Sequence, residues 1–394
     1  MVDNPRSERT VEFDPLDLEL SRDLWARSRH LRDECPVAWS ESQGGFWVIG
    51  RYDDVFAAAK SWRNFTTTKG AAPVRFDNEL FDMVPLETDP PFHREVRDLL
   101  SPFFTAEAIA AKEPLIGQIV HDLLAPCLND EPVDFTAAFT GVLPAIVIFQ
   151  THFEQDPAQV GAILKVLTRL FTAPQDAGEI VPELLDWCSS LLDSARARND
   201  RDTMIGTIAH AGPLNGFELT DKLRTEIVWQ LTMAGLDTTT AGLANLTMRL
   251  ADPALRERLR GADRETLDRA ISEFLRFEAP VPTGGRTVTR DLEVGGCPLS
   301  EGDFILLNWA SANRDERVFP DPDTLDIDRP NAVRHLSFGA GVHRCLGRHL
   351  AAAELRFVIK ELSQLARLDV ETDGIVYRAG FVRAPEPLIV TASR

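Results

Sequence analysis

Apolar residues occur nearly all round the helix predicted for one long segment, TDKLRTEIVWQLTMAGLDTTTAGLANLTMRLADP (residues 220–253). A surface helix carries one apolar stripe, so a helix that is apolar on every side is expected to be buried. Thr220 is placed to cap its first turn, and Asp252-Pro253 should stop it. At 1.5 Å per residue, about 32 residues extend roughly 48 Å, enough to cross a whole domain.

Strand-like patterns are short and lie away from this segment. GGFWVIGRYDDV (44–55) predicts a strand, a turn and the start of a helix, and DLEVGGCPLSEGDFILLN (291–308) predicts a hairpin that turns at Gly295-Gly296. The end of the chain, YRAGFVRAPEPLIVTAS (377–393), predicts another short strand pair. With no internal repeat or linker, we predict one domain over residues 1–394 that is mainly α-helical, with small peripheral β-sheets.

Charge and composition narrow the class of protein. Lys and Arg total 42 against 61 Asp and Glu, so the formal net charge is −19, which argues against nucleic acid as a partner. No run of eighteen apolar residues predicts a membrane span. The opening residues, MVDNPRSERTVEFDP, lack the apolar core of a signal peptide. We therefore expect a cytoplasmic protein with no membrane partner.

The chain has five cysteines, an odd number with no close pair, which disfavours a disulfide framework or a cysteine-based zinc site. Cys345 differs from the others because it lies in a glycine-rich turn before a predicted helix, LSFGAGVHRCLGRHLAAAE (336–354). A thiolate is a strongly donating ligand for iron, and a turn that enters a helix offers it amide donors and a positive dipole. The helix should start near Leu346. The alternative is an inert, reduced cysteine.

The pattern Phe338-Gly339-x-Gly341-x-His343-x-Cys345-x-Gly347 resembles the haem-binding signature of the cytochrome P450 monooxygenases, in their soluble bacterial branch. The resemblance covers about residues 12–391. It implies the cytochrome P450 fold, with the long central helix over the haem. It also implies haem b as the cofactor and Cys345 as the ligand of its iron, with Phe338, Gly339, His343 and Gly347 among the residues that contact it.

Other residues match positions that this family uses. Glu273 and Arg276 would form a buried structural pair beneath the cysteine loop, although at i, i+3 spacing a surface pair is the plain alternative. Buried haem propionates need cationic or hydrogen-bonding partners. The resemblance assigns that role to His93, Arg97, Arg286 and His335.

The stretch MAGLDTTT (233–240) is unusual inside a helix, because glycine, aspartate and threonine are poor helix formers. It resembles the family motif that opens a groove over the iron. Ala234 would contact haem and substrate, Thr238 would hydrogen-bond the bound oxygen, and Asp237 would relay protons. The alternative is that threonine hydroxyls bond back to the preceding turn.

The substrate pocket is less clearly marked. FDNELFDMVPLETDPP (76–91) and RAGFVRAPEPLIV (378–390) are similar to the covering segments of the camphor-hydroxylase type, with Phe81 where that type has a tyrosine. A small hydrophobic substrate, a terpenoid or a simple aromatic, is expected. Arg75 or Arg383 could instead anchor a carboxylate. The candidate pocket residues are Phe81, Met83, Leu86, Met233, Ala234, Val281, Phe381 and Val382.

No glycine loop for a flavin or nicotinamide and no cysteine cluster for an iron–sulfur centre is present, so electrons must come from another protein. The family implies a ferredoxin with its reductase, and O2 as co-substrate. Arg344, Arg348 and Arg97 are candidates for the ferredoxin-docking face. Two alternatives remain open: a peroxide-driven haem enzyme, and a haem-thiolate protein that binds ligands or carries electrons.

Overall fold

Helix α9 (Asp221–Leu250) runs unbroken for 30 residues through the helical half of the molecule. The computed structural model describes residues 9–74, 81–172 and 176–394. As predicted, the Thr220 hydroxyl caps α9 by accepting from the amide of Leu223. Other helices are α1 (Leu18–Glu34), α2 (Tyr52–Lys60), α3 (Phe92–Leu100), α4 (Ala106–Leu124), α5 (Leu143–Thr151), α6 (Pro157–Thr172), α7 (Ala177–Ala197), α8 (Met204–His210), α10 (Pro253–Leu259), α11 (Arg264–Glu278), α12 (Trp309–Ala312) and α13 (Arg348–Leu362).

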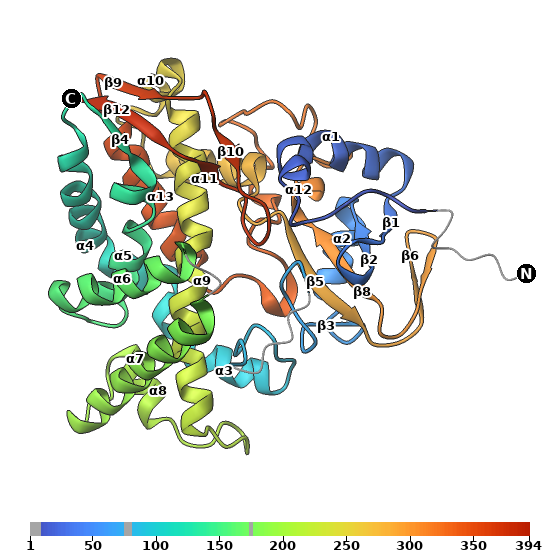
Figure 1. Cartoon of the computed structure of the whole chain (residues 1–394), viewed down its shortest axis with the longest axis horizontal. Helices are drawn as coiled ribbons and strands as arrows, with labels where there is room; N and C mark the ends of the chain where they lie inside the picture. Colours follow the sequence, from blue (N-terminus) through green and yellow to red (C-terminus); the bar gives the residue numbers. More distant parts are fainter. Residues whose placement is uncertain (1–8, 75–80, 173–175) are drawn as a thin grey trace, which may run out of the picture.

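Helices α5, α7, α11 and α13 pack on α9, which explains why it is buried on most sides. In Figure 1 the helices α4 to α9, α11 and α13 gather on one side of the molecule, and the largest sheet lies on the other side with α1 and α2. The main apolar core fills the helical side, and a smaller core lies around the sheet. Among the described residues, no helix is long and apolar enough to cross a membrane.

The largest sheet has the strand order β1-β2-β8-β5-β3. Strand β8 runs parallel to β2 and antiparallel to β5. A three-stranded sheet has the order β4-β12-β9, and two hairpins pair β6 with β7 and β10 with β11. The strands are β1 (Val37–Ser40), β2 (Phe46–Ile49), β3 (Phe65–Thr66), β4 (Pro132–Asp134), β5 (Thr283–Val288), β6 (Leu292–Val294), β7 (Cys297–Leu299), β8 (Phe304–Asn308), β9 (Arg367–Val370), β10 (Val376–Tyr377), β11 (Pro385–Glu386) and β12 (Ile389–Ser393).

The predicted strand positions are largely confirmed. Gly295 and Gly296 form the β6–β7 turn with φ of 54° and 75°, the backbone conformation that a two-residue hairpin loop requires. The prediction for the C-terminal end was incomplete. Strands β10 and β11 pair there, but β12 leaves this hairpin and pairs with β9 and β4 instead. Such long-range pairing leaves no local trace in the sequence.

The predicted pair of Glu273 and Arg276 is buried on α11, with neither side chain exposed. The Glu273 carboxylate also accepts from Arg329 Nε at 3.1 Å, and Arg276 Nη1 donates to the Asn313 carbonyl at 2.9 Å. The Asn313 side chain in turn accepts from the amide of Leu336 at 2.6 Å. This network joins α11 to the segment before the cysteine loop, and so holds that loop in place.

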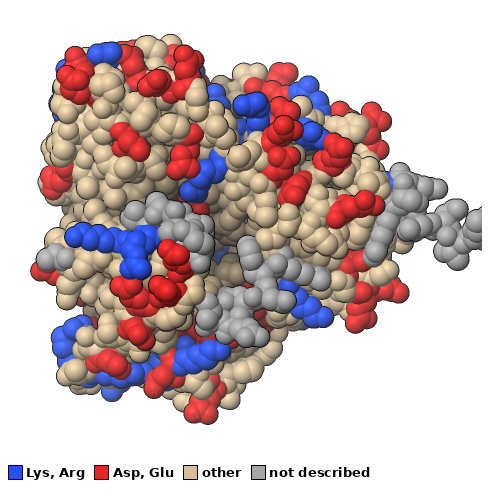
Figure 2. Space-filling model, viewed as in Figure 1, with Lys and Arg blue, Asp and Glu red and all other residues tan. Residues whose placement is uncertain are grey.

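Acidic and basic side chains are intermixed on the face shown in Figure 2. The acidic ones contribute to the net charge of −19.

Candidate functional site

The cysteine loop is shaped by glycines. Gly339 and Gly341 have φ of 65° and 70°, values that residues with a side chain rarely adopt. A Cβ at Gly341 would lie 2.6 Å from the carbonyl oxygen of Ala59 in α2, so only glycine fits. The loop closes when the amide of Cys345 donates to the Phe338 carbonyl at 2.8 Å.

Cys345 is half-buried, just before α13. The amide of Gly347, the residue before the first turn of α13, donates a hydrogen bond to the cysteine sulfur. Burial raises the pKa of the Cys345 thiol, and this amide together with the nearby cations of Arg97, Arg344 and Arg348 acts in the opposite direction. These are the surroundings in which a bound thiolate is stabilised. Helix α13 begins at Arg348, two residues after the predicted start.

Four arginines near the loop have no acidic partner. Within the part of the chain that the structure describes, Arg97, Arg286, Arg344 and Arg348 form no ion pair. Arg286 is buried in β5, where Nη1 donates only to the neighbouring Gly285 carbonyl, and burial lowers its pKa to about 10. Asp89 acts on Arg286 without forming an ion pair, and a buried cation with no anion in direct contact is costly. The arrangement therefore fits an anionic ligand.

The three histidines of the predicted haem set are neutral at pH 7. Burial lowers the pKa of His93 to about 4, that of His335 to about 3 and that of His343 to about 2. The rings of His93 and His343 pack with centroids 4.3 Å apart. His335 Nδ1 accepts from the amide of Ser337 at 3.2 Å, so its proton lies on Nε2 and can be donated. They can contribute hydrogen bonds rather than charge.

The middle of α9 is accessible although the helix around it is buried. Ala234 is exposed, and Met233, Asp237 and Thr238 are half-buried. The expected local weakening does not interrupt the helix, and the Thr238 hydroxyl donates to the Ala234 carbonyl at 2.8 Å. Asp237 forms an ion pair with Arg378 of the C-terminal segment. The acid and the alcohol therefore lie side by side on an accessible stretch of α9.

The candidate pocket residues fall into separate groups. Phe81 packs on Trp229 of α9 with ring centroids 4.8 Å apart, and both Phe81 and Met233 border the helical core. Val281 and Val382 share a small cluster with Ala241 of α9. Met83 and Leu86 are half-buried beside Phe81 in the chain, whereas Phe381 is 40% exposed. No single contact cluster unites the predicted set.

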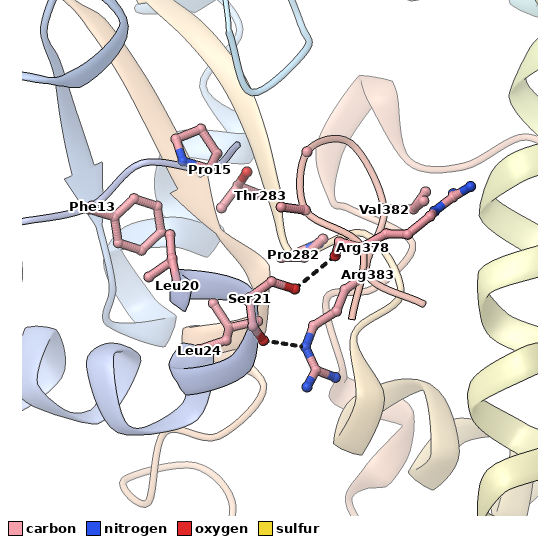
Figure 3. A pocket seen from close by; sticks show the side chains of 12 residues that line it. Phe13, Pro15, Leu20, Ser21, Leu24, Pro282, Thr283, Arg378, Val382 and Arg383 are labelled. Carbon is pink, nitrogen blue, oxygen red and sulfur yellow. Dashed lines mark hydrogen bonds between the residues drawn. The ribbon is translucent and has the colours of Figure 1, made fainter. Parts of the chain in front are cut away.

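Two arginines, Arg75 and Arg383, were predicted as possible anchors for a substrate carboxylate. Arg75 lies outside the described residues. Arg383 is buried and faces α1, where its Nε donates to the Ser21 carbonyl at 3.0 Å, and its Nη1 lies 3.7 Å from Glu278 Oε2. Nη1 has no hydrogen-bond partner among the described residues, but the nearby Glu278 carboxylate already offsets the charge of Arg383 and would repel a substrate carboxylate, so the structure does not favour Arg383 as that anchor. Figure 3 shows the Ser21 contact in a small pocket, which none of the predicted haem-binding residues lines.

The loop offers a metal a single protein ligand. No group of three or more His, Cys, Asp or Glu side chains suitable for a metal ion occurs among the described residues. An iron bound by Cys345 must therefore bring its other ligands with it, as it does in a porphyrin. A flat group of this kind would meet little obstruction at Gly347, where an added Cβ would contact nothing within 4 Å. The residues present fit haem.

A helical fold with one cysteine in a glycine loop, ringed by unpaired arginines, defines a haem-thiolate protein. The chain belongs to the cytochrome P450 family, whose profile matches residues 164–391. Cytochrome P450 123 of Mycobacterium tuberculosis is 31% identical over 378 residues, 92% of each chain. Cyclomarin C epoxidase CymV of Salinispora arenicola is 31% identical over 379 residues, 90% of this chain and 91% of that one. The solved structure of CYP109Q5 from Chondromyces apiculatus superposes with a TM-score of 0.85 at 28% identity, covering 97% of this chain and 98% of that one.

The protein is thus a cytochrome P450 monooxygenase, an oxidoreductase of a family that uses haem b. Its reaction requires an organic substrate, O2 and a redox partner. This class and the fold could be predicted from the sequence, whereas three polar residues near the site were not among the predicted ones. Arg378 opens the predicted covering segment 378–390 and Asn313 lies in a polar stretch, but only the folded chain shows the partners of these two side chains. Gln230 could have been noticed as an amide within the most apolar helix.

Proposed function

We propose that the protein inserts one atom of O2 into a small hydrophobic substrate, a terpenoid or a simple aromatic, with electrons from a ferredoxin and its reductase. The observation that carries the proposal is the group of arginines around Cys345 that have no acidic partner. Haem, when bound, supplies the oxidising chemistry by activating O2 at its iron. The apolar character of Phe81, Met83, Leu86 and Val382 supports a hydrophobic substrate.

In this proposal Cys345 would hold the iron of the haem and Phe338 would pack against the porphyrin. Arg97 and Arg286 hold the propionates by charge, and His93 and His335 donate hydrogen bonds to them as neutral rings. The arginines remain cationic, and burial lowers the pKa of His93 and His335, whereas a neighbouring propionate would act in the opposite direction. We therefore assign the charge to the arginines and hydrogen bonds to the histidines.

Proton delivery is assigned to the acid and the alcohol on α9. Thr238 donates to the Ala234 carbonyl, which leaves lone pairs on its oxygen to accept a proton donor. Asp237 is half-buried and paired with Arg378, and because this ion pair opposes protonation, Asp237 would turn away from Arg378 to take up a proton from solvent and pass it toward Thr238. Both groups lie beside the accessible surface of Ala234, where the substrate would bind.

The ferredoxin surface is proposed around Arg344, which is exposed next to the iron ligand. Arg97 Nη2 donates to the Arg344 carbonyl at 2.8 Å, so the guanidinium group of Arg97 lies against the backbone of Arg344. If such cations steer an acidic ferredoxin, added salt should lower the rate of electron transfer from the ferredoxin to the enzyme. Arg344→Glu should slow electron transfer from ferredoxin while the enzyme's carbon monoxide spectrum stays unchanged.

The test of the proposed function is spectral and catalytic. The reduced protein with carbon monoxide should show the red-shifted band of thiolate-bound haem, and Cys345→Ser should abolish it. A screen of small terpenoids and aromatics should then find compounds that shift the ferric spin state and are oxidised with ferredoxin, reductase and O2. Oxidation with peroxide but none with ferredoxin would instead establish the peroxide-driven alternative.

A further inference from the structure

Gln230 is a polar side chain without a partner inside α9. It is only 9% exposed, and its Oε1 has no hydrogen-bond partner among the described residues. Asn245, the other buried amide of this helix, also leaves its Oδ1 without a partner, but its Nδ2 donates to the carbonyls of Ala241 and Arg383. An amide oxygen that is removed from water and left unpaired is costly. Gln230 therefore lacks the structural role that Asn245 has.

Gln230 lies on the same side of α9 as the residues assigned to oxygen activation. Ala234 is four residues further along and Asp237 seven, so the three side chains share one face of the helix. Ala234 is exposed in the middle of this face. The amide thus borders the accessible stretch over which the substrate would bind.

Two covering segments attach to α9 on either side of Gln230. On the N-terminal side, Glu226 Oε1 accepts from the backbone amide of Asp82 at 2.9 Å, and Trp229 packs on Phe81. On the C-terminal side, Ala241 shares a cluster with Val382. Both segments belong to the predicted substrate pocket, so Gln230 lies between its two walls.

We infer that Gln230 is a hydrogen-bonding anchor for the substrate, which is an apolar molecule carrying one hydroxyl or amide N–H group. The inference rests on the proposed function, because that function places the substrate beside Ala234. It adds a polar requirement to a pocket that the sequence predicts as apolar.

The surrounding charges decide which polar group fits. Glu226 lies one turn before Gln230, is 2% exposed, and leaves its Oε2 without a partner. Lys222 lies 3.3 Å from the other oxygen, Oε1. Two unsatisfied acceptor oxygens one turn apart favour a hydrogen-bond donor and disfavour a carboxylate, which Glu226 would repel. The inference therefore selects an alcohol, phenol or amide over an aromatic acid.

The experiment compares matched ligands on matched variants of the holoenzyme. The probes are alcohol and hydrocarbon pairs, namely perillyl alcohol with limonene, 4-isopropylphenol with cumene, and 1-adamantanol with adamantane. Their Kd values are measured by ferric spin-state titration for the wild type, Gln230→Leu and Met233→Leu. Met233→Leu alters the shape of the same helix face without removing a polar group.

In the wild type, at least one alcohol should bind about 5- to 10-fold more tightly than its hydrocarbon, the size of one net hydrogen bond. That ratio should fall to about 1 in Gln230→Leu and persist in Met233→Leu. The inference is overturned if no alcohol exceeds its hydrocarbon partner, if no probe binds, or if the ratio survives in Gln230→Leu. It is also overturned if Gln230→Leu strengthens both members of a pair equally, which is the behaviour of an amide that only holds water.

The carbon monoxide spectrum separates this inference from the proposed function. Suppose that each variant keeps the red-shifted band and oxidises a bound probe. An affinity ratio between alcohol and hydrocarbon that differs from the expected one then overturns only the role of Gln230 as an anchor, and the proposed function stands. If the wild type lacks the band, the proposed function fails first.

Discussion

Arg276 and Glu273 lie one turn apart on α11 and are joined by two hydrogen bonds, of 2.7 and 2.8 Å, with neither side chain exposed. Arg276 Nη1 also donates to the carbonyls of Asn313 and Pro322, each at 2.9 Å. The pair therefore ties a helix to the irregular segment that leads to the cysteine loop. Each of these two buried charges compensates the other, so removing one would leave the other unpaired in the interior.

Glu273→Gln should lower the free energy of unfolding by about 3–5 kcal/mol, because it leaves the buried charges of Arg276 and Arg329 uncompensated. Urea unfolding followed by circular dichroism measures this loss. Glu265→Gln is the matched control on the same helix, since Glu265 pairs with Arg269 at 3.5 Å on the surface. The control should change stability by less than about 0.5 kcal/mol. Equal effects of the two substitutions would refute the structural role.

Arg286→Gln should weaken haem binding without destabilising the apoprotein. The bound form loses a charge-assisted hydrogen bond of about 1.5–3 kcal/mol, which should raise the rate of haem transfer to apomyoglobin by about 10-fold or more. The apoprotein instead loses a buried cation that has no ion-pair partner among the described residues.

Arg290→Gln is the control for this prediction, because Arg290 is exposed just beyond β5. It should leave haem transfer unchanged. An apoprotein of Arg286→Gln that unfolds at markedly lower urea would mean that Arg286 supports the fold rather than the cofactor.

Thr238→Ala should keep the carbon monoxide spectrum but divert electrons into hydrogen peroxide. Loss of a positioned proton carrier slows the proton-dependent step by orders of magnitude in typical enzymes, so product per electron should fall by about 10-fold or more. Product, peroxide and reduced cofactor consumed are measured together.

Thr240→Ala is the matched control on α9, because the Thr240 hydroxyl donates to the Thr140 carbonyl at 3.2 Å. Its coupling should match the wild type. Thr238→Ala with unchanged product per electron would show that the hydroxyl only stabilises the helix.

The buried side chain of His152 should make the free energy of unfolding depend on pH. Burial lowers its pKa to about 3, and its ring stacks on Phe104 with centroids 4.7 Å apart. Above pH 6.5 the ring is neutral in both states, but as the pH falls from 6.5 toward 3 only the unfolded chain takes up the proton. Stability should therefore fall in this window, by up to about 1.4 kcal/mol per pH unit for this group. In urea titrations between pH 7.5 and 5, His152→Phe should show a shallower loss, and an unaltered slope would contradict the assignment.

The cysteine loop and α9 could be predicted from the sequence because their determinants are local. Gly341 is required by a backbone conformation and by close contact with α2, and Thr220 caps the helix that it precedes. The β6–β7 hairpin followed from its two glycines for the same reason.

The partners of the site residues could not be predicted, because they are distant in the chain. Arg378 pairs with Asp237 across 141 residues, and Asn313 reaches Leu336 by its side chain. Arg383 is the opposite case, because the sequence suggested a role that the fold does not support. Its charge suggested a substrate anchor, but the fold turns it toward Ser21 and Glu278. A charged residue in a sequence does not reveal which neighbour neutralises it.

The attachment of two covering segments to separate parts of α9 has an evolutionary consequence. Glu226 and Trp229 hold the segment at Phe81 and Asp82, whereas Ala241 holds the segment at Val382. Substitutions in either segment can reshape the cavity while Asp237 and Thr238, on the stretch between them, keep their geometry. Selectivity can therefore diverge between descendants of this chain without renewed optimisation of its chemistry.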